Sequence, residues 1–186
     1  MMLELGIGPI ACHATSEQAR FSTTAPLNVL ATPDVIEIAT AIGIAASDVV
    51  LDTHPTTTTI GLLFTLTEVA NRHILSQAKI NIDALKRFAQ SYPQANRFGH
   101  YVYTRSDGAI HERMFDPLDN IPEDPATGSA AATLGALLVN CTQTPQKFSL
   151  YQSDDMGRSS QIEVHAEAGQ FAISGSAVAV MEGNLL

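Results

Sequence analysis

A short polar segment, EDPATGS at residues 123–129, is the part of the sequence best suited to chemistry. An alanine- and leucine-rich run follows it, which predicts a helix that begins at Thr127-Gly128-Ser129. The first amides of a helix lack intrahelical partners and attract anions, and a glycine leaves them open to a ligand. The Asp124 carboxylate can accept a proton or contact an ammonium group. The segment therefore suits an amino acid or a similar carboxylic acid.

The same residues also have a purely structural interpretation. Serine or threonine before an alanine-rich run commonly caps a helix, and Asp-Pro commonly leads from a loop into one. The pattern leaves both interpretations open. It does not favour Ser129 as a nucleophile, because the sequence has no Gly-x-Ser-x-Gly elbow and no evident histidine partner there. Proton transfer needs a positioned acid or base, and one aspartate with one serine is a small set for that task.

The composition narrows the class of partner. The 186 residues carry 10 Lys and Arg against 19 Asp and Glu, a net charge of -9, which argues against nucleic acid. The apolar runs at 38–46 and 130–139 are interrupted or too short to span a bilayer, and the first residues lack the basic start of a signal peptide. We therefore expect a cytoplasmic protein with no membrane partner. Cys12 and Cys141 form no C-x-x-C pair that would indicate zinc or a redox dithiol.

Periodic patterns along the chain predict the elements that would position the polar segment. Apolar residues at helical spacing predict a helix over 35–42, with Pro33 and Asp34 in its first turn and Gly43 at its end, and a second helix over 82–90. Together with the helix after residue 129, the pattern indicates an α+β fold in which a mostly antiparallel sheet wraps one small-residue helix. The predicted strands lie within 49–59, 62–66, 100–104, 111–115, 148–152, 161–165, 170–173 and 177–180, and 100–104 forms a hairpin with 111–115.

The first residues indicate a beginning in the middle of a domain. Alternation predicts two short strands, at 3–10 with a break at Gly8-Pro9 and at 19–22. A strand at the very start has no earlier strand to pair with, so its neighbour must come from elsewhere or its edge stays open. We expect residues 1–31 to be remnant strands of an N-terminal domain, and residues 32–186 to be a C-terminal domain whose last strand can pair with the remnant.

Several motifs together resemble one known family. The block EDPATGSAA (123–131), preceded by RMFDP (113–117), is similar to the signature of the phenazine-biosynthesis PhzF-like family, which shares the diaminopimelate epimerase fold. Further matches follow in order: LELGIGPI (3–10), AIGI (41–44), MGRS (156–159), and the closing Ser-Gly. The resemblance implies two similar domains, each a sheet curled around a central helix, with the active site in the cleft between them. Here it implies one complete domain and the tail of a second.

The resemblance assigns roles to residues at matching positions. Asp124 corresponds to the family's substrate-contacting aspartate, and Ser129, with the amides of Thr127 and Gly128, to its carboxylate-holding helix start. Gly61 corresponds to the end of a Ser-Thr-Gly turn near the family's cleft. We therefore expect catalytic roles for Asp124 and Ser129, and substrate binding by these residues together with Gly61.

Other family positions have no match here. The family's acid/base glutamate and its Gly-His segment both precede the point where this chain begins. His13 lies in a similar tetrapeptide but follows the LELGIGPI match instead of preceding it, so we expect a surface turn there. Gln152-Ser153 replaces a frequent Gln-Gly. Arg113 and Arg158 could hold a substrate carboxylate, although single arginines more often have structural roles.

The resemblance implies an isomerase or epimerase that moves a proton on a small carboxylate-bearing substrate. No metal, flavin or nucleotide cofactor would be needed, and we expect none. The cleft would be completed by a homodimer or by a complementary N-terminal half. The alternative is a catalytically silent, truncated remnant that serves as a ligand-binding or dimerising domain.

Overall fold

The computed structural model describes residues 2–5, 8–93, 99–176 and 181–184. Its helices are α1 (Val35–Ile42), α2 (Arg72–Gln77), α3 (Ile82–Ser91) and α4 (Gly128–Thr142), with short 3-10 turns η1 (Ala46–Asp48), η3 (Pro117–Asp119) and η4 (Asp154–Met156). Its strands are β1 (Met2–Leu5), β2 (Gly8–Ala14), β3 (Ala19–Thr24), β4 (Asn28–Ala31), β5 (Thr56–Thr59), β6 (Leu63–Glu68), β7 (His100–Ser106), β8 (Ala109–Asp116), β9 (Ile121–Asp124), β10 (Gln146–Gln152), β11 (Ser160–Glu167) and β12 (Gln170–Gly175).

These strands form one mixed sheet. Their order is β1-β2-β3-β12-β11-β10-β8-β7-β6-β5-β4, with β9 added beside β8. Neighbours are antiparallel except β10 with β8 and β6 with β7. Each parallel pair is connected through helices, because a parallel connection has to cross back over the sheet. The predicted α+β, mostly antiparallel architecture is confirmed.

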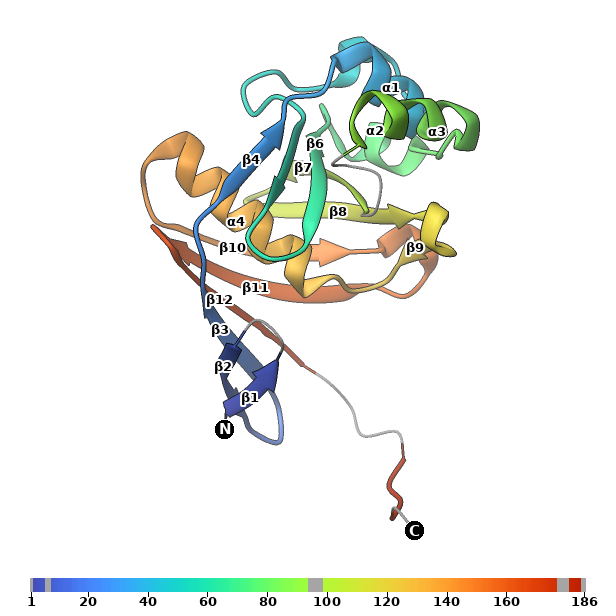
Figure 1. Ribbon diagram of the computed structural model, residues 1–186. Helices are drawn as coiled ribbons and strands as arrows, with labels where there is room; N and C mark the ends of the chain where they lie inside the picture. Colours follow the sequence, from blue (N-terminus) through green and yellow to red (C-terminus); the bar gives the residue numbers. More distant parts are fainter. Residues whose placement is uncertain (1, 6–7, 94–98, 177–180, 185–186) are drawn as a thin grey trace.

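Helix α4 lies inside the curl of the sheet (Figure 1). Its residues 130–138 are all buried, as expected for a helix that is covered on every side. Small residues bring the sheet close to it: a Cβ at Gly135 would come within 3.0 Å of Ala166 and Val164 of β11. The surrounding core includes Phe64, Leu66, Tyr101, Tyr103, Leu150, Val164 and Phe171.

A second core fills the opposite face of β6 to β8. There α1, α2 and α3 pack on the sheet, and Ile38, Leu85 and Phe88 meet Val102 and Phe115. Residues alternate between the two cores along each strand, so β7 is buried on both faces. This sandwich fixes β8, which carries β9 and the start of the polar segment.

Most of the predicted elements are confirmed. The helices at 35–42 and 82–90, the hairpin of β7 with β8, the helix after Thr127 and the three strands β10 to β12 all form as predicted. Asp34 is corrected: it lies outside the first turn of α1 and caps the helix, accepting from the amides of Ile36 and Glu37 at 2.8 and 3.1 Å. The strand predicted at 177–180 lies outside the described residues.

Other predictions need correction. The break predicted at Gly8-Pro9 is wrong, because β1 ends at Leu5 and both residues lie in β2, where they pair with β1. Residues 49–55 form only a single bridge, Val49 with Val69, and the strand begins at Thr56. Helix α2 and strands β4 and β9 were not predicted, because each is too short to show a clear periodic pattern.

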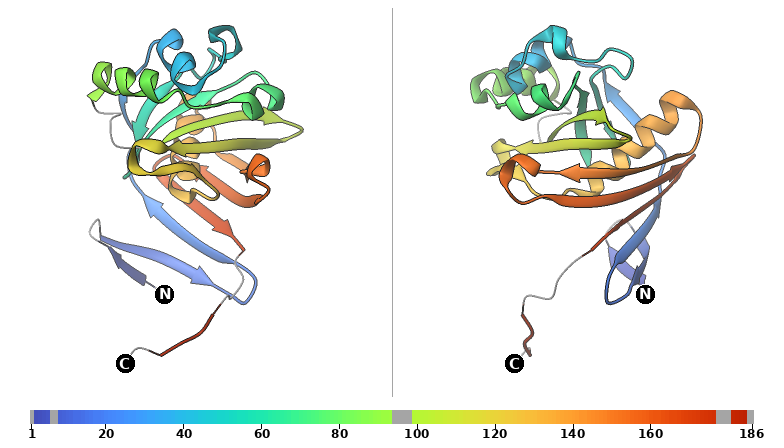
Figure 2. Two further views of the ribbon diagram at one scale, coloured as in Figure 1. Left: turned by 90° about the vertical axis from the view of Figure 1, so that its right-hand side faces the viewer. Right: turned by 180° about the vertical axis from the view of Figure 1, so that it is seen from behind.

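The first three strands project from the body of the molecule (Figure 2). β1 pairs with β2, so its neighbour comes from the segment that follows it, and no described strand lies on its other side. β3 pairs with β12 from Ala19 opposite Gly175 to Thr24 opposite Gln170. The sheet is therefore continuous between residues 1–31 and the rest. The domain boundary at residue 32 stays a prediction.

Gly43 offers a test of the turn after α1. Its φ is 73°, and a Cβ there would collide with the carbonyl oxygen of Lys79. We expect Gly43→Ala to lower the free energy of unfolding by about 3 kcal/mol, from the left-handed backbone and the clash combined. Gly108→Ala is the matched control: its φ is 77° but nothing lies near its Cβ, so we expect about 1 kcal/mol. Urea unfolding measures both, and equal losses would contradict the clash.

His100 makes stability depend on pH. It is 4% exposed and packs edge-on against Phe88, with ring centroids 5.3 Å apart. Burial lowers the pKa of His100 from 6.5 to about 4. Between these values the unfolded chain binds a proton that the folded chain does not, so stability falls as the pH falls through this window.

We expect this loss to reach about 3 kcal/mol in wild type and to be missing from His100→Phe, which keeps an aromatic ring and cannot titrate. Urea unfolding from about pH 8 to about pH 4 measures it as the change in the difference between the two proteins. A difference that stays constant over this range would show that His100 titrates normally.

Candidate functional site

Strand β9 carries Asp124 to the start of α4. β9 pairs antiparallel with β8, and Asp124 lies opposite Met114. The strand is anchored by a half-buried ion pair in which Arg113 donates from Nε and Nη2 to Glu123 at 2.9 and 2.8 Å. Arg113 also donates from Nη1 to three carbonyls at the end of α2, the closest being Ala78 at 2.9 Å. Arg113 therefore has the structural role, and Arg158 is exposed.

Thr127 turns toward Asp124 instead of capping α4. Its hydroxyl donates to Asp124 Oδ2 at 2.5 Å, and no side chain at this N-cap position bonds to the helix amides. The capping bond expected from Thr127 in the structural interpretation is therefore wrong, although Asp124-Pro125 does lead into the helix as that interpretation expected. The Thr127 amide is bonded to Gln152, so of the amides expected to hold a carboxylate those of Gly128 and Ser129 lack a side-chain cap, beside an oriented carboxylate.

Gln152 connects this segment to β10. Its fully buried amide accepts from the Thr127 backbone N–H at 2.6 Å and donates to the Asp124 carbonyl at 2.7 Å and to Thr127 Oγ1 at 2.9 Å. Three hydrogen bonds thus hold the loop between β9 and α4. Gln152 could not be assigned this role from the sequence. The feature of the sequence that could have indicated this role is a polar residue at a core-facing position of a predicted strand.

Ser153 completes this support. It is fully buried with a φ of 63°, a left-handed conformation in which the glycine frequent at this family position would be less strained. Its hydroxyl donates to the Asp124 carbonyl at 3.0 Å, a bond that glycine could not make. The backbone of Asp124 is therefore held by two side chains from the end of β10.

Gly128 and Ser129 form the first residues of α4. A Cβ at Gly128 would meet Ile173 of β12 at 3.6 Å and Phe21 of β3 at 3.7 Å, which are ordinary contact distances. The helix start therefore lies against two apolar side chains, one of them from residues 1–31. Ser129 is half-buried, and its carbonyl accepts from Thr133 Oγ1 at 2.9 Å. Its hydroxyl has no role that the structure assigns.

Gly61 lies apart from this group. It forms the turn between β5 and β6, where its N–H donates to Thr59 Oγ1 at 2.8 Å. It borders a cavity of about 680 Å³ whose walls come mainly from β2, β3, β11 and β12. Asp124, Thr127, Gly128 and Ser129 do not line that cavity. The structure thus brings Asp124 into contact with Thr127. Substrate binding by Gly61 together with these residues stays a prediction.

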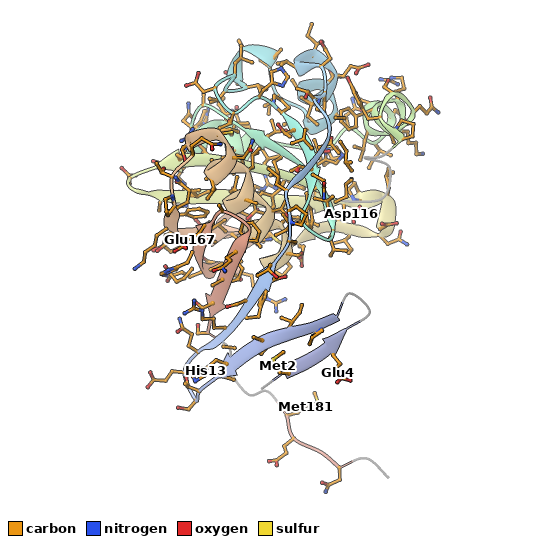
Figure 3. All side chains as sticks on the ribbon, turned by 60° about the vertical axis from the view of Figure 1, so that its left-hand side comes forward. Met2, Glu4, His13, Asp116, Glu167 and Met181 are labelled. Atoms are coloured by element: carbon orange, nitrogen blue, oxygen red, sulfur yellow. The ribbon has the colours of Figure 1, made fainter. Side chains whose placement is uncertain are left out.

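His13 does not join the site. It lies exposed in β2, not in the surface turn that we expected, and Figure 3 shows it on the projecting strands. Within the described ranges, no three His, Cys, Asp or Glu side chains gather in a way that could hold a metal ion. In the same part of the chain, no helix is both long and apolar enough to cross a membrane.

A second carboxyl lies buried near Asp124. Glu112 of β8 is 1% exposed, and burial raises its pKa well above 4.5, with the Asp124 and Glu123 charges raising it further. Glu112 was not among the residues predicted to belong to the site. The feature of the sequence that could have indicated it is a charged residue that alternates with Ile110 and Met114, on the face of the strand that is buried.

Comparisons with known proteins agree with this architecture. The family model described as phenazine biosynthesis-like protein (PhzC-PhzF) matches residues 2–183. An uncharacterized isomerase of Mesorhizobium japonicum is 29% identical over 204 residues, spanning 99% of this chain and 67% of the relative. An uncharacterized isomerase of Clostridium acetobutylicum is 36% identical over 126 residues, spanning 60% of this chain and 41% of the relative.

Solved structures of the same family share the fold. A PhzF-family phenazine biosynthesis protein of Bacillus anthracis superposes with a TM-score of 0.77 at 20% identity, covering 100% of this chain and 68% of that one. A predicted epimerase of Pseudomonas aeruginosa gives 0.73 at 26% identity, covering 94% and 62%. This chain thus spans about two thirds of the length of the M. japonicum relative and of these two structures, and it belongs to the phenazine biosynthesis-like PhzC-PhzF family.

Proposed function

We propose that this chain provides the substrate-anchoring side of a cofactor-independent isomerase or epimerase that moves a proton on a small carboxylate-bearing molecule. The observation that carries the proposal is the Asp124 carboxylate, oriented by Thr127 beside an uncapped helix start. The names of the M. japonicum relative and of the P. aeruginosa structure, an isomerase and a predicted epimerase, support the reaction class.

In this proposal the helix amides bind the substrate and Asp124 acts on its proton. The amides at Gly128 and Ser129 can donate to a substrate carboxylate, whose negative charge the helix N-terminus favours. Asp124 can then accept a proton from the substrate or hold its polar group, because the Thr127 hydroxyl binds Oδ2 of the carboxylate and not Oδ1. Ser129 contributes its amide and a hydroxyl within the same turn.

A one-sided set of this kind needs a second group to return the proton. We propose that a second copy of the chain or a complementary N-terminal half supplies it, docked against the projecting strands. We also propose a cytoplasmic location and a reaction without metal, flavin or nucleotide. The net charge of -9 repels an anionic ligand, so its binding depends on the local positive field at the start of α4.

A second candidate is a ligand-binding or dimerising domain without turnover. The observation that favours it is the projecting β1 to β3 segment, on which the apolar side chain of Met2 is 58% exposed. Exposed apolar side chains next to an open strand edge are typical of a surface that pairs with another chain. The two candidates differ in whether the chain exchanges substrate protons.

Proton exchange in heavy water tests the proposed function. We expect the purified chain, alone or with its complementary partner, to exchange the α-proton of at least one acid in a panel of small amino and hydroxy acids, followed by NMR. Asp124→Asn should reduce the rate by at least about 100-fold, because it removes the acid/base group while keeping the shape. Asp107→Asn, on the tip of the β7–β8 hairpin, is the matched control and should exchange at the wild-type rate.

The outcomes separate the two candidates. Exchange that survives in Asp124→Asn would contradict the role of Asp124. Absence of exchange, with ligand-induced NMR shifts that disappear in Asp124→Asn, would favour the silent binding domain.

A further inference from the structure

Glu112 is placed where a core residue would be expected. It lies in the middle of β8, opposite Tyr103 of β7 and Gln152 of β10. Its neighbours on the same face, Ile110 and Met114, belong to the core around α4. A carboxyl at this position has no exposed path to water, since the residue is only 1% exposed.

Within the described residues the Glu112 carboxyl has no cationic partner, and the Tyr101 hydroxyl compensates its charge only in part. Neither of its oxygens makes a hydrogen bond within the described residues, and the same is true of the nearby Tyr101 hydroxyl. That hydroxyl lies close enough to lower the pKa of Glu112, but this effect is smaller than the rise caused by burial. An unpaired buried carboxylate is strongly disfavoured, so the group stays protonated.

Glu112 and Asp124 are connected through the same two residues. Gln152 lies across the ladder from Glu112 and donates to the Asp124 carbonyl at 2.7 Å. The Ser153 N–H donates to the Glu112 carbonyl at 3.3 Å, while the Ser153 hydroxyl donates to the Asp124 carbonyl at 3.0 Å. The two acidic residues thus share their supports, and the charge of Asp124 acts on Glu112.

Few other charges face this pair. From β7 come Tyr101 and Tyr103, whose hydroxyl donates to Glu68 at 3.3 Å. From β9 comes Glu123, which the Arg113 ion pair compensates. β10 offers the neutral Gln152, and the first turn of α4 contains no acidic residue. No ion pair to Asp124 occurs within the described part of the chain, so Asp124 is the main uncompensated charge near Glu112.

We propose that Glu112 and Asp124 form a carboxyl pair that carries one negative charge and one proton, with Glu112 acting through Asp124 as a positioning residue of the site. The inference rests on the proposed function for its role in catalysis. A single charge leaves the helix start attractive to a substrate carboxylate, whereas a second would repel it. When Asp124 accepts a proton from the substrate, its repulsion of a charge on Glu112 disappears, while burial continues to favour the protonated form of Glu112.

The charge pair can be measured without any substrate. We expect ¹³C NMR of the side-chain carboxyls to show Glu112 protonated through neutral pH in wild type. Asp124→Asn should lower the titration midpoint of Glu112 by at least about one pKa unit, a tenfold change in proton affinity, because the neighbouring charge is gone. Asp107→Asn, remote on the hairpin tip, should leave this midpoint unchanged. A wild-type Glu112 that titrates near its ordinary value, or a midpoint that Asp124→Asn does not move, would overturn the pair.

Glu112→Gln provides the functional readout. The folded pKa of Glu112 is raised, so its contribution to stability is present below about pH 4.5 and is lost as the pH rises toward the folded value. The variant should lack this loss and gain stability over wild type at neutral pH. We also expect proton exchange by wild type to decline at alkaline pH as Glu112 ionises, because a second negative charge repels the substrate carboxylate, and we expect Glu112→Gln to lack this decline.

The titration and the exchange assay together distinguish the proposed carboxyl pair from the proposed isomerase function. A coupled titration with no exchange in any protein would refute the proposed activity and leave the charge pair standing. Exchange with identical pH profiles in wild type and Glu112→Gln would refute the positioning role while keeping the activity. Should Glu112→Gln fail to fold, the Asp124→Asn titration still decides whether the pair exists, because it observes the native Glu112.

Discussion

The structure depends on the close packing of the sheet around α4. Alanines and Gly135 leave the helix surface smooth, so β11 approaches to contact distance, and the strands on either side can curl over it. A larger side chain at Gly135 would push β11 outward and open the core. Because α4 is held on all sides, its first turn has a fixed place relative to β3, β8, β10 and β12. The candidate site uses that fixed end.

The loop before α4 is positioned by residues that are distant in sequence. Gln152 reaches it from β10, and Arg113 anchors β9 from β8. These bonds free the Thr127 hydroxyl to bind Asp124, where an isolated helix would use it as a cap. The loop thus gives up a local stabilising bond and receives long-range support instead. This exchange of partners leaves the start of α4 without a side-chain cap.

Local patterns were sufficient to predict much of this fold. Helical spacing identified α1 and α3, alternation identified the hairpin and the late strands, and the polar segment placed Asp124 and the helix start correctly. The roles of Gln152, Ser153 and Glu112 could not be predicted, because they follow from the pairing of β8 with β10, a register between strands separated by a helix. Nor could the sequence show that Gly61 borders a cavity that Asp124 does not line.

The surroundings of the helix start strengthen electrostatic effects there. Phe21 and Ile173 close one side of Gly128 with apolar groups, and the core around Glu112 closes the inside. In such poorly hydrated surroundings, the attraction between the helix amides and an anion grows, and so does the repulsion between neighbouring carboxylates. A site that gains from the first effect must control the second, since its aspartate and its ligand share one sign of charge. A neutral Glu112 meets that requirement. The cost is a buried acid that destabilises the folded core.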